Sequence, residues 1–162
     1  MAVATGLDFL RVEGFVYAHV GDEGVHESCA AELVRRRALL KAEHIKIYAD
    51  IKKKHSAHAI TSDVSLAETA RNAEFFLADG VIVTGASTGY AADKEEVRAV
   101  REAVNIRVLV GSGVTSQNIP ALAPLCDAVI VGSAVKFDGL WSNDVDPERV
   151  NRLVDALAAA VR

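Results

Sequence analysis

The sequence predicts an α/β fold with a parallel sheet, and two observations carry this prediction. Apolar, β-branched runs alternate along the chain with segments of helical periodicity, which is the pattern of βαβ units. Two of these runs, within "ADGVIVTGAS" (78–87) and "CDAVIVGSAV" (126–135), repeat an Asp, a small residue, "VIV" and a glycine-containing turn. Because "VIV" has no polar face, we expect such a strand to be covered on both sides.

Five apolar runs are expected to form the strands of this sheet. Ligands in α/β proteins bind at the loops that follow the carboxyl ends of parallel strands, in barrels and open sheets alike. The functional residues should therefore lie just after these runs. In chain order the runs are "DFLRVEGF" (8–15), "IKIYADI" (45–51), "GVIVTG" (80–85), "RVLVGSG" (107–113) and "AVIVGSA" (128–134).

Four segments between and after the strands are expected to be helices. Ser65 followed by Glu68 has the spacing of a capping box, which satisfies two otherwise unpaired backbone donors. Asp146 followed by Pro147 suits a cap and a first helical position, where a missing N–H costs nothing. No linker or composition shift interrupts the pattern, so we expect one domain over residues 1–162. The predicted helices are 26–42, 65–78, 93–104 and 146–161.

Composition limits the classes of function. The 162 residues are 51% hydrophobic and 25% charged, with a net charge of −4 from interspersed acids and bases. This balance does not favour nucleic acid as a partner. No apolar run approaches the roughly 18 residues that span a bilayer, so membrane insertion is not expected. Cys29 and Cys126 lack metal-ligand spacing and suit buried positions in a reducing compartment.

The clearest candidate site lies in two glycine loops on the last two predicted strands. Gly111, Gly113 and Gly132 let the backbone approach a ligand closely, while Ser112 and Ser133 supply hydroxyl groups. Backbone N–H groups there, with the start of a short helix, form an anion site of the kind that holds phosphate. The alternative is that the glycines only make tight turns. We expect a small phosphorylated ligand at this position.

A second candidate is the stretch "KIYADIKKKH" (46–55). Alternation along a strand turns Asp50 and Lys52 toward one face, where a barrel interior would lie. A buried Asp beside Lys52 would be paired and could transfer protons. The alternative places the lysines in an exposed loop, which we favour for Lys53 and Lys54. His55 and His58, three residues apart, allow a metal pair, but no third ligand is near in sequence, so no cofactor is predicted.

Two further groups of polar residues follow predicted strands. Arg11 and Glu13 share one face of an otherwise apolar strand, which implies an interior or substrate-facing ion pair. Thr84 and Gly85 open a turn whose hydroxyl groups could bind a polyhydroxylated ligand, although this is also a common turn composition. Three polar residues after the first strand are expected in a charged loop, and two more follow Thr84: His19, Asp22 and Glu23, then Ser87 and Thr88.

Several of these stretches together resemble one family. "DFLRVEGFVYAHVGDEG", "KIYADIKKKHSAHAI", "DGVIVTGASTG", "VLVGSGVTSQN" and "VIVGSAVKFDGLWSNDVDPERV" are similar to the BtpA/SgcQ family over essentially the whole chain. The resemblance implies a (β/α)8 barrel of the ribulose-phosphate-binding type and supports phosphate at the two glycine loops. The family is named for a cyanobacterial member linked to photosystem I assembly, and other members are described only as candidate enzymes. It assigns no catalytic residue.

The resemblance also implies a difference in length. Family members are longer at the N-terminus, so we expect this sequence to correspond to the C-terminal part of the barrel, without the first three βα units. Five strands cannot close an eight-stranded barrel, and the outer strands should present unpaired edges that favour homo-oligomers or self-association. The expected alternatives are a fragment of a longer product or a chain whose edges a partner covers.

Three functional hypotheses follow. The first is an enzyme on a sugar phosphate or nucleoside-like substrate, with Asp50 as acid or base and Lys52 as its partner. The second is a non-catalytic assembly or stabilisation factor, and the third a non-functional truncated product. "MAVATG" lacks the regions of a signal peptide, so we expect a cytoplasmic protein, or one of an organelle matrix if a targeting segment is missing.

Overall fold

The fold is a parallel, five-stranded sheet flanked by helices, as predicted. The computed structural model describes residues 1–85 and 91–160. The sheet order is β1-β4-β6-β7-β8, and every neighbouring pair is parallel. All five predicted strands are present but shorter than expected: β1 (Phe9–Val12), β4 (Lys46–Ile51), β6 (Gly80–Val83), β7 (Arg107–Val110) and β8 (Ala128–Val129).

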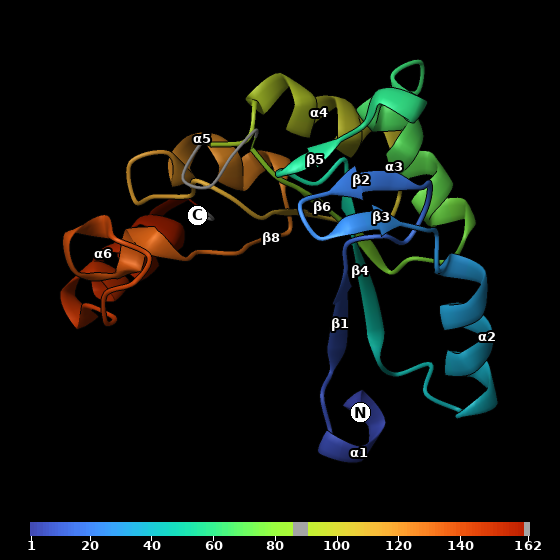
Figure 1. Ribbon diagram of the computed structural model, residues 1–162. Coiled ribbons are helices and arrows are strands. Elements are labelled where there is room, and N and C mark those ends of the chain that lie inside the picture. The colour runs from blue at the N-terminus through green and yellow to red at the C-terminus, as the bar shows by residue number, and fades with distance from the viewer. Residues whose placement is uncertain (86–90, 161–162) are drawn as a thin grey trace.

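Four helices match the predicted segments, and Figure 1 shows them along the sheet. Ser65 caps α3 (Leu66–Phe75) by accepting a hydrogen bond from the Glu68 N–H, and Asp146 caps α6 (Pro147–Ala160) through the Glu148 N–H. The expected end of α6, Val161, lies outside the described residues. The other two are α2 (Ala30–Leu39) and α4 (Lys94–Ala103); the short elements are α1 (Ala2–Thr5), α5 (Ile119–Leu122), η1 (Ala59–Thr61), η2 (Ala123–Leu125), η3 (Ser133–Val135) and η4 (Phe137–Gly139).

The two faces of the sheet have different surroundings. Ile47, Val81 and Val108 point toward the helices and are fully buried in the main core. The opposite face carries a separate small cluster that includes Tyr48 and Ile82. The prediction that both "VIV" runs are covered on two sides is right for β6 and wrong near β8, where residues 129–131 are only half-buried. An edge strand has no neighbour on one side, which explains the difference.

A second, antiparallel sheet was not predicted. Its order is β3-β2-β5, and its register pairs Val20 with Val25 and with Ala57. Residues expected as a charged loop and as the start of a helix form instead the hairpin β2 (His19–Gly21) and β3 (Gly24–His26), joined by Asp22 and Glu23, and β5 (Ser56–Ala57) completes the sheet. Figure 1 shows this small sheet at the carboxyl ends of β1 and β4.

The repeated Asp before each "VIV" has a structural role. Asp79 accepts a hydrogen bond from the Ile47 N–H at 2.9 Å and pairs with Arg37 of α2. Asp127 accepts one from the Val108 N–H at 2.8 Å and pairs with Arg101 of α4. Each carboxylate thus joins a strand to a neighbouring strand and to a helix. Burial raises the pKa of Asp79, but the hydrogen bonds from Ile47, Arg37 and Lys46 outweigh it and lower the pKa overall.

Candidate functional site

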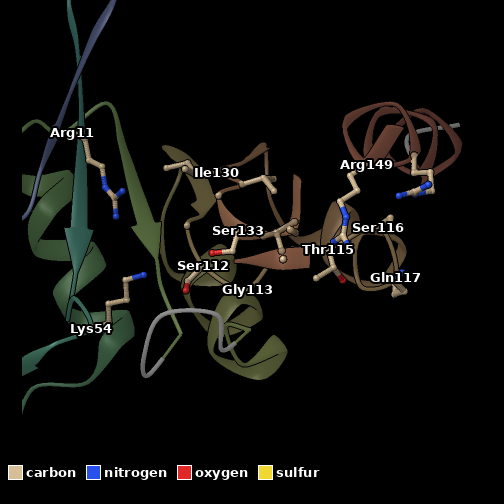
Figure 2. A pocket seen from close by; sticks show the side chains of 17 residues that line it. Arg11, Lys54, Ser112, Gly113, Thr115, Ser116, Gln117, Ile130, Ser133 and Arg149 are labelled. Atoms are coloured by element: carbon tan, nitrogen blue, oxygen red, sulfur yellow. The ribbon is translucent and has the colours of Figure 1, made fainter. Parts of the chain in front are cut away.

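The candidate site is a groove of about 610 Å³ at the carboxyl ends of β7 and β8. Figure 2 shows Arg11 and Lys54 on one side of it, Thr115 and Arg149 on the other, and Ser133 between them. All five predicted residues of the two glycine loops line this groove. The structure therefore brings together Gly111, Ser112, Gly113, Gly132 and Ser133, as the sequence predicted.

The loop after β7, residues 111–118, needs its glycines and has internal support. A Cβ on Gly111 would lie 2.6 Å from Cγ2 of Ile82, and Gly113 has a φ of 61°. The Asn118 side chain holds the turn: its Nδ2 donates to the Gly113 carbonyl at 2.8 Å, and its Oδ1 accepts from the Thr115 N–H at 2.8 Å. Oγ1 of Thr115 also accepts from the Asn118 N–H at 3.3 Å, so side chains within the loop hold its shape, and Asn118 was not a predicted site residue.

The loop after β8 has free space beside its glycine, whereas the space beside Gly111 in the loop after β7 is filled. Gly132 precedes the 3₁₀ turn η3, and a Cβ built on it meets nothing within 4 Å. Ser133, the first residue of that turn, lines the groove. Gly132 thus opens a tight turn, as the alternative reading of the glycines expects, and the open space beside its backbone also suits the approach of a ligand.

Two arginines of α6 complete the wall of the groove. Arg149 and Arg152 are three residues apart, so they share one face of the helix. Arg149 also pairs with the capping residue Asp146 at 3.4 Å, and Arg152 pairs with Glu148 at 3.7 Å. Neither arginine was among the predicted site residues, although their spacing was a usable signal.

The charges around the groove have one sign. Four cationic side chains line it, and no Asp or Glu is among the described residues that do so: Arg11, Lys54, Arg149 and Arg152. Lys54 has no ion pair within the described residues. Such a lining lowers the energy of a bound anion.

Arg11 and Asp50 form a two-bonded pair across β1 and β4. Nε and Nη2 of Arg11 donate to the two carboxylate oxygens at 2.7 and 2.8 Å. The Asp50 side chain is fully buried, whereas that of Arg11 is 38% exposed. The hydrogen bond to Asp50 raises the pKa of Arg11. The expected Asp50–Lys52 pair is wrong: Lys52 donates to the Thr61 carbonyl at 3.3 Å, because its positive φ turns the chain out of the strand.

Glu13 and Lys53 form the neighbouring pair, at 2.6 Å. The Lys53 side chain is only 10% exposed, which corrects the expectation of a solvated lysine. Their hydrogen bond lowers the pKa of Glu13 and raises that of Lys53. Glu13 thus pairs with a lysine of the next loop, and the implied pairing of Arg11 with Glu13 is replaced by two cross-strand pairs.

A smaller cavity of about 200 Å³ adjoins the groove. Arg11 and Lys54 line both spaces. Thr84 lines the smaller one, and its buried Oγ1 has no hydrogen-bond partner among the described residues. Predicted Gly85 lies at a different space, while Ser87 and Thr88 fall outside the described residues. The other residues around the cavity are Glu13, Asp22, Glu23, Asp50, Lys53 and His55.

The histidines near this cavity do not make the helical pair considered above. His55 precedes strand β5 and His58 follows it. His58 lies 5.3 Å from His19 between ring centroids, and His19 stacks on His26 at 4.9 Å. Across residues 1–85 and 91–160, no group of three or more His, Cys, Asp or Glu residues could hold a metal ion.

A match to a protein-family model shows which family the chain belongs to. The model described as the BtpA family matches residues 1–159. The chain belongs to the BtpA family. A photosystem I biogenesis protein, BtpA of Synechocystis, is 32% identical over the whole chain and 56% of its own length. The chain spans between about half and two thirds of the length of the curated relatives it matches.

Other BtpA-family relatives come from animals and archaea. A Caenorhabditis elegans protein described as uncharacterised and mitochondrial is 50% identical over 95% of this chain and 55% of its own length. An uncharacterised protein of Archaeoglobus fulgidus is 39% identical over 96% of this chain and 60% of its own length. Within the described residues of our chain, helices are too short or too polar to cross a membrane.

Solved structures establish the fold of this BtpA-family chain. It is similar to thiamine phosphate pyrophosphorylase from Pyrococcus furiosus, with a TM-score of 0.64 and 18% identity over 99% of this chain and 64% of that one. For 3-hexulose-6-phosphate synthase from Salmonella typhimurium the TM-score is 0.66, with 19% identity over 98% of this chain and 65% of that one. Both are barrel-type enzymes, so the sheet is a sector of a (β/α) barrel, as predicted.

Proposed function

We propose that the groove at β7 and β8 binds the phosphate group of a small phosphorylated molecule. One observation carries the proposal: four cationic side chains and two glycine loops line one groove that has no carboxylate among its described residues. Phosphate binds where backbone N–H groups, hydroxyls and cations converge. The similar structures support the same ligand class, since a thiamine phosphate pyrophosphorylase and a 3-hexulose-6-phosphate synthase are among them.

Isothermal titration with inorganic phosphate and ribose 5-phosphate tests the proposal. The double substitution R149Q/R152Q should weaken binding of both by about tenfold or more, because charge-assisted hydrogen bonds contribute about 1.5–3 kcal/mol each. R98Q is the matched control: Arg98 is an exposed arginine of α4 that pairs with Glu95, three residues before it, and lies away from the groove. Absence of binding by the unsubstituted protein, or equal loss in the control, would contradict the proposal.

Conversion of the bound molecule is a further part of the proposal. Asp50 is the acid or base, and Arg11 takes the place of Lys52 as its electrostatic partner. Incubation with ribose 5-phosphate, followed by ³¹P NMR, should then show a new resonance that D50N abolishes. If binding persists and no sugar phosphate is converted, the groove is a binding site only.

A second candidate is an assembly or stabilisation factor. It is supported by the Synechocystis relative, which is described as a photosystem I biogenesis protein, and by exposed apolar side chains next to the groove. Phe137, Leu140 and Trp141 lie in and after η4, and Trp141 is 72% exposed. Substituting all three by Ser should abolish capture of a protein partner while leaving phosphate titrations unaffected. If the protein has no such role, the unsubstituted protein and the triple Ser variant should not differ in capture of a protein partner.

A further inference from the structure

Charges are divided unequally between the groove and the cavity beside it. The groove has cations and no carboxylate among its described lining residues, whereas the cavity has four carboxylates and three cations. Two ion pairs within the cavity, Arg11–Asp50 and Glu13–Lys53, cancel most of this charge. The other titratable residues that line the cavity are Asp22 and Glu23, between β2 and β3, together with His55 and Lys54, and Lys54 also lines the groove.

The two carboxylates of Asp22 and Glu23 disfavour a second anion in the cavity. A phosphate bound in the groove would draw on the charge of Lys54 and leave Asp22 and Glu23 with less cationic charge around them, since Lys53 is already paired with Glu13. Like charges brought together at short range repel strongly when water is excluded. The cavity therefore suits an uncharged group that can both donate and accept hydrogen bonds.

Thr84 adds an independent observation. Its side chain sits at the carboxyl end of β6, the residue is 8% exposed, and its Oγ1 has no partner within the described residues. A buried hydroxyl without a partner is rare in folded proteins, so each instance requires an explanation. A ligand hydroxyl in the cavity would provide the missing partner, and Thr84 can donate to it and accept from it.

We infer that the cavity is a subsite for hydroxyl groups, and that the ligand carries phosphate at one end only and hydroxyls at the other. The inference rests on the proposed phosphate site and names the class of molecule that fills it. Arg11 and Lys54 lie at the junction of the two spaces. A liquid water molecule takes up about 30 Å³, so the cavity of about 200 Å³ has room for a short polyol chain.

Three phosphate esters separate the contributions of the two spaces. Butyl phosphate has no hydroxyls, fructose 6-phosphate has hydroxyls and one phosphate, and fructose 1,6-bisphosphate adds a second anion. In isothermal titrations at low salt, fructose 6-phosphate should bind at least about tenfold more tightly than butyl phosphate, the effect of one or two good hydrogen bonds. The bisphosphate should bind no more tightly than the monophosphate, despite its greater charge.

Substitutions assign these differences to the cavity. T84V keeps the shape of the side chain and removes its hydroxyl, so the ratio of fructose 6-phosphate affinity to butyl phosphate affinity should fall severalfold. D22N/E23Q removes two negative charges from the cavity, so the bisphosphate should gain affinity relative to the monophosphate. Both variants are read as ratios measured on one protein sample, so a partial loss of folded protein does not change the result.

The outcomes distinguish this inference from the proposal beneath it. If none of the three esters binds, the phosphate site itself is wrong. If all bind with equal affinity, the phosphate site stands and the hydroxyl subsite is overturned. If the bisphosphate binds more tightly than the monophosphate and D22N/E23Q does not change their ratio, the charge argument is overturned as well.

Discussion

The pair between Arg11 and Asp50 is the most buried charge interaction of the site. Asp50 has no exposed side-chain surface, and both of its oxygens accept from Arg11. D50N removes the charge and one acceptor, so we expect a loss of about 1–3 kcal/mol in the free energy of unfolding, below the roughly 3–5 kcal/mol of a fully buried pair because Arg11 is partly exposed.

Urea unfolding measures this loss, and a double-mutant cycle with R11Q separates the pair from its surroundings. The two substitutions should be strongly non-additive, since both act on the same two hydrogen bonds and the same pair of charges. Additive losses would mean that the pair contributes little, and that Asp50 is retained for its role at the cavity.

His19 predicts a dependence of stability on pH. Burial lowers its pKa below the ordinary value of 6.5, and the charges of His58, His26 and Lys53 lower it further, against a smaller opposite effect of Glu13. Because the unfolded chain binds the proton more readily, this part of the stability is present above about pH 6.5 and is lost as the pH falls through the lower folded-state pKa.

The measurement compares urea midpoints at about pH 7.5 and about pH 5.5. H19F retains an aromatic ring against His26 and removes the titration, so the loss between the two pH values should be smaller than in the unsubstituted protein. H44Q is the control, because His44 is exposed and outside the cluster. Equal pH dependence in H19F and H44Q would contradict the assignment.

At the scale of elements, the loop after β7 depends on one side chain. Asn118 bonds to the backbone of Gly113 and Thr115, and N118A removes both contacts. We expect phosphate to bind about tenfold more weakly, since the N–H groups of the loop are no longer held in position, and stability to fall by about 1–2 kcal/mol. Phosphate titration and urea unfolding measure the two effects.

N151A on the exposed face of α6 is the control for this loop and should leave both quantities unchanged. A loss of stability without a loss of phosphate affinity would show that the loop does not need its preorganised form to bind. Asp79 and Asp127 provide a similar joint at the opposite ends of the strands, and they account for the repeat that drew attention to the two "VIV" runs.

At the scale of the molecule, the sheet has two open ends and an exposed apolar interior. Among the described residues, β1 and β8 each have a neighbouring strand on one side only, and a partly apolar space of about 310 Å³ lies on the inner face beside Phe9 and Tyr48. Open edges favour pairing with another chain. We therefore expect self-association that increases with concentration in sedimentation velocity, and F9K should shift it toward monomer.

A matched change away from the edges tests this expectation. Leu39 is more exposed than Phe9, but it lies at the end of α2. L39K should therefore not alter the sedimentation profile if the edges of the sheet are responsible for self-association. A protein that stays monomeric up to about 100 μM, where the free energy of association would be weaker than about −5.5 kcal/mol, would contradict self-association.

Much of the fold was predictable because its signals are local. Buried runs such as "VIV" fix the strands, and Ser65 and Asp146 fix where two helices begin. The hairpin was missed because "HVGDEGVH" is short and polar, although glycines on either side of Asp22 and Glu23 were a usable signal for a two-residue turn.

The glycine loops of the candidate site were predicted from the sequence, but the pairing of its charged side chains was predicted only in part. Gly111 and Gly132 were found because a glycine after a strand is visible in sequence. The partner of Asp50 was not, since pairing between β1 and β4 joins residues 39 positions apart. Alternation along one strand suggested Lys52, but its positive φ ends that alternation.

The ladder that joins β2 to β5 limits how the family can change. Loops of a barrel ordinarily vary one at a time, each on its own strand and helix. Here the loop after β1 and the loop after β4 share backbone hydrogen bonds through Val20 and Ala57, and a shift by one residue would turn every side chain of the hairpin over. Insertions in one loop should therefore be inherited together with compensating changes in the other.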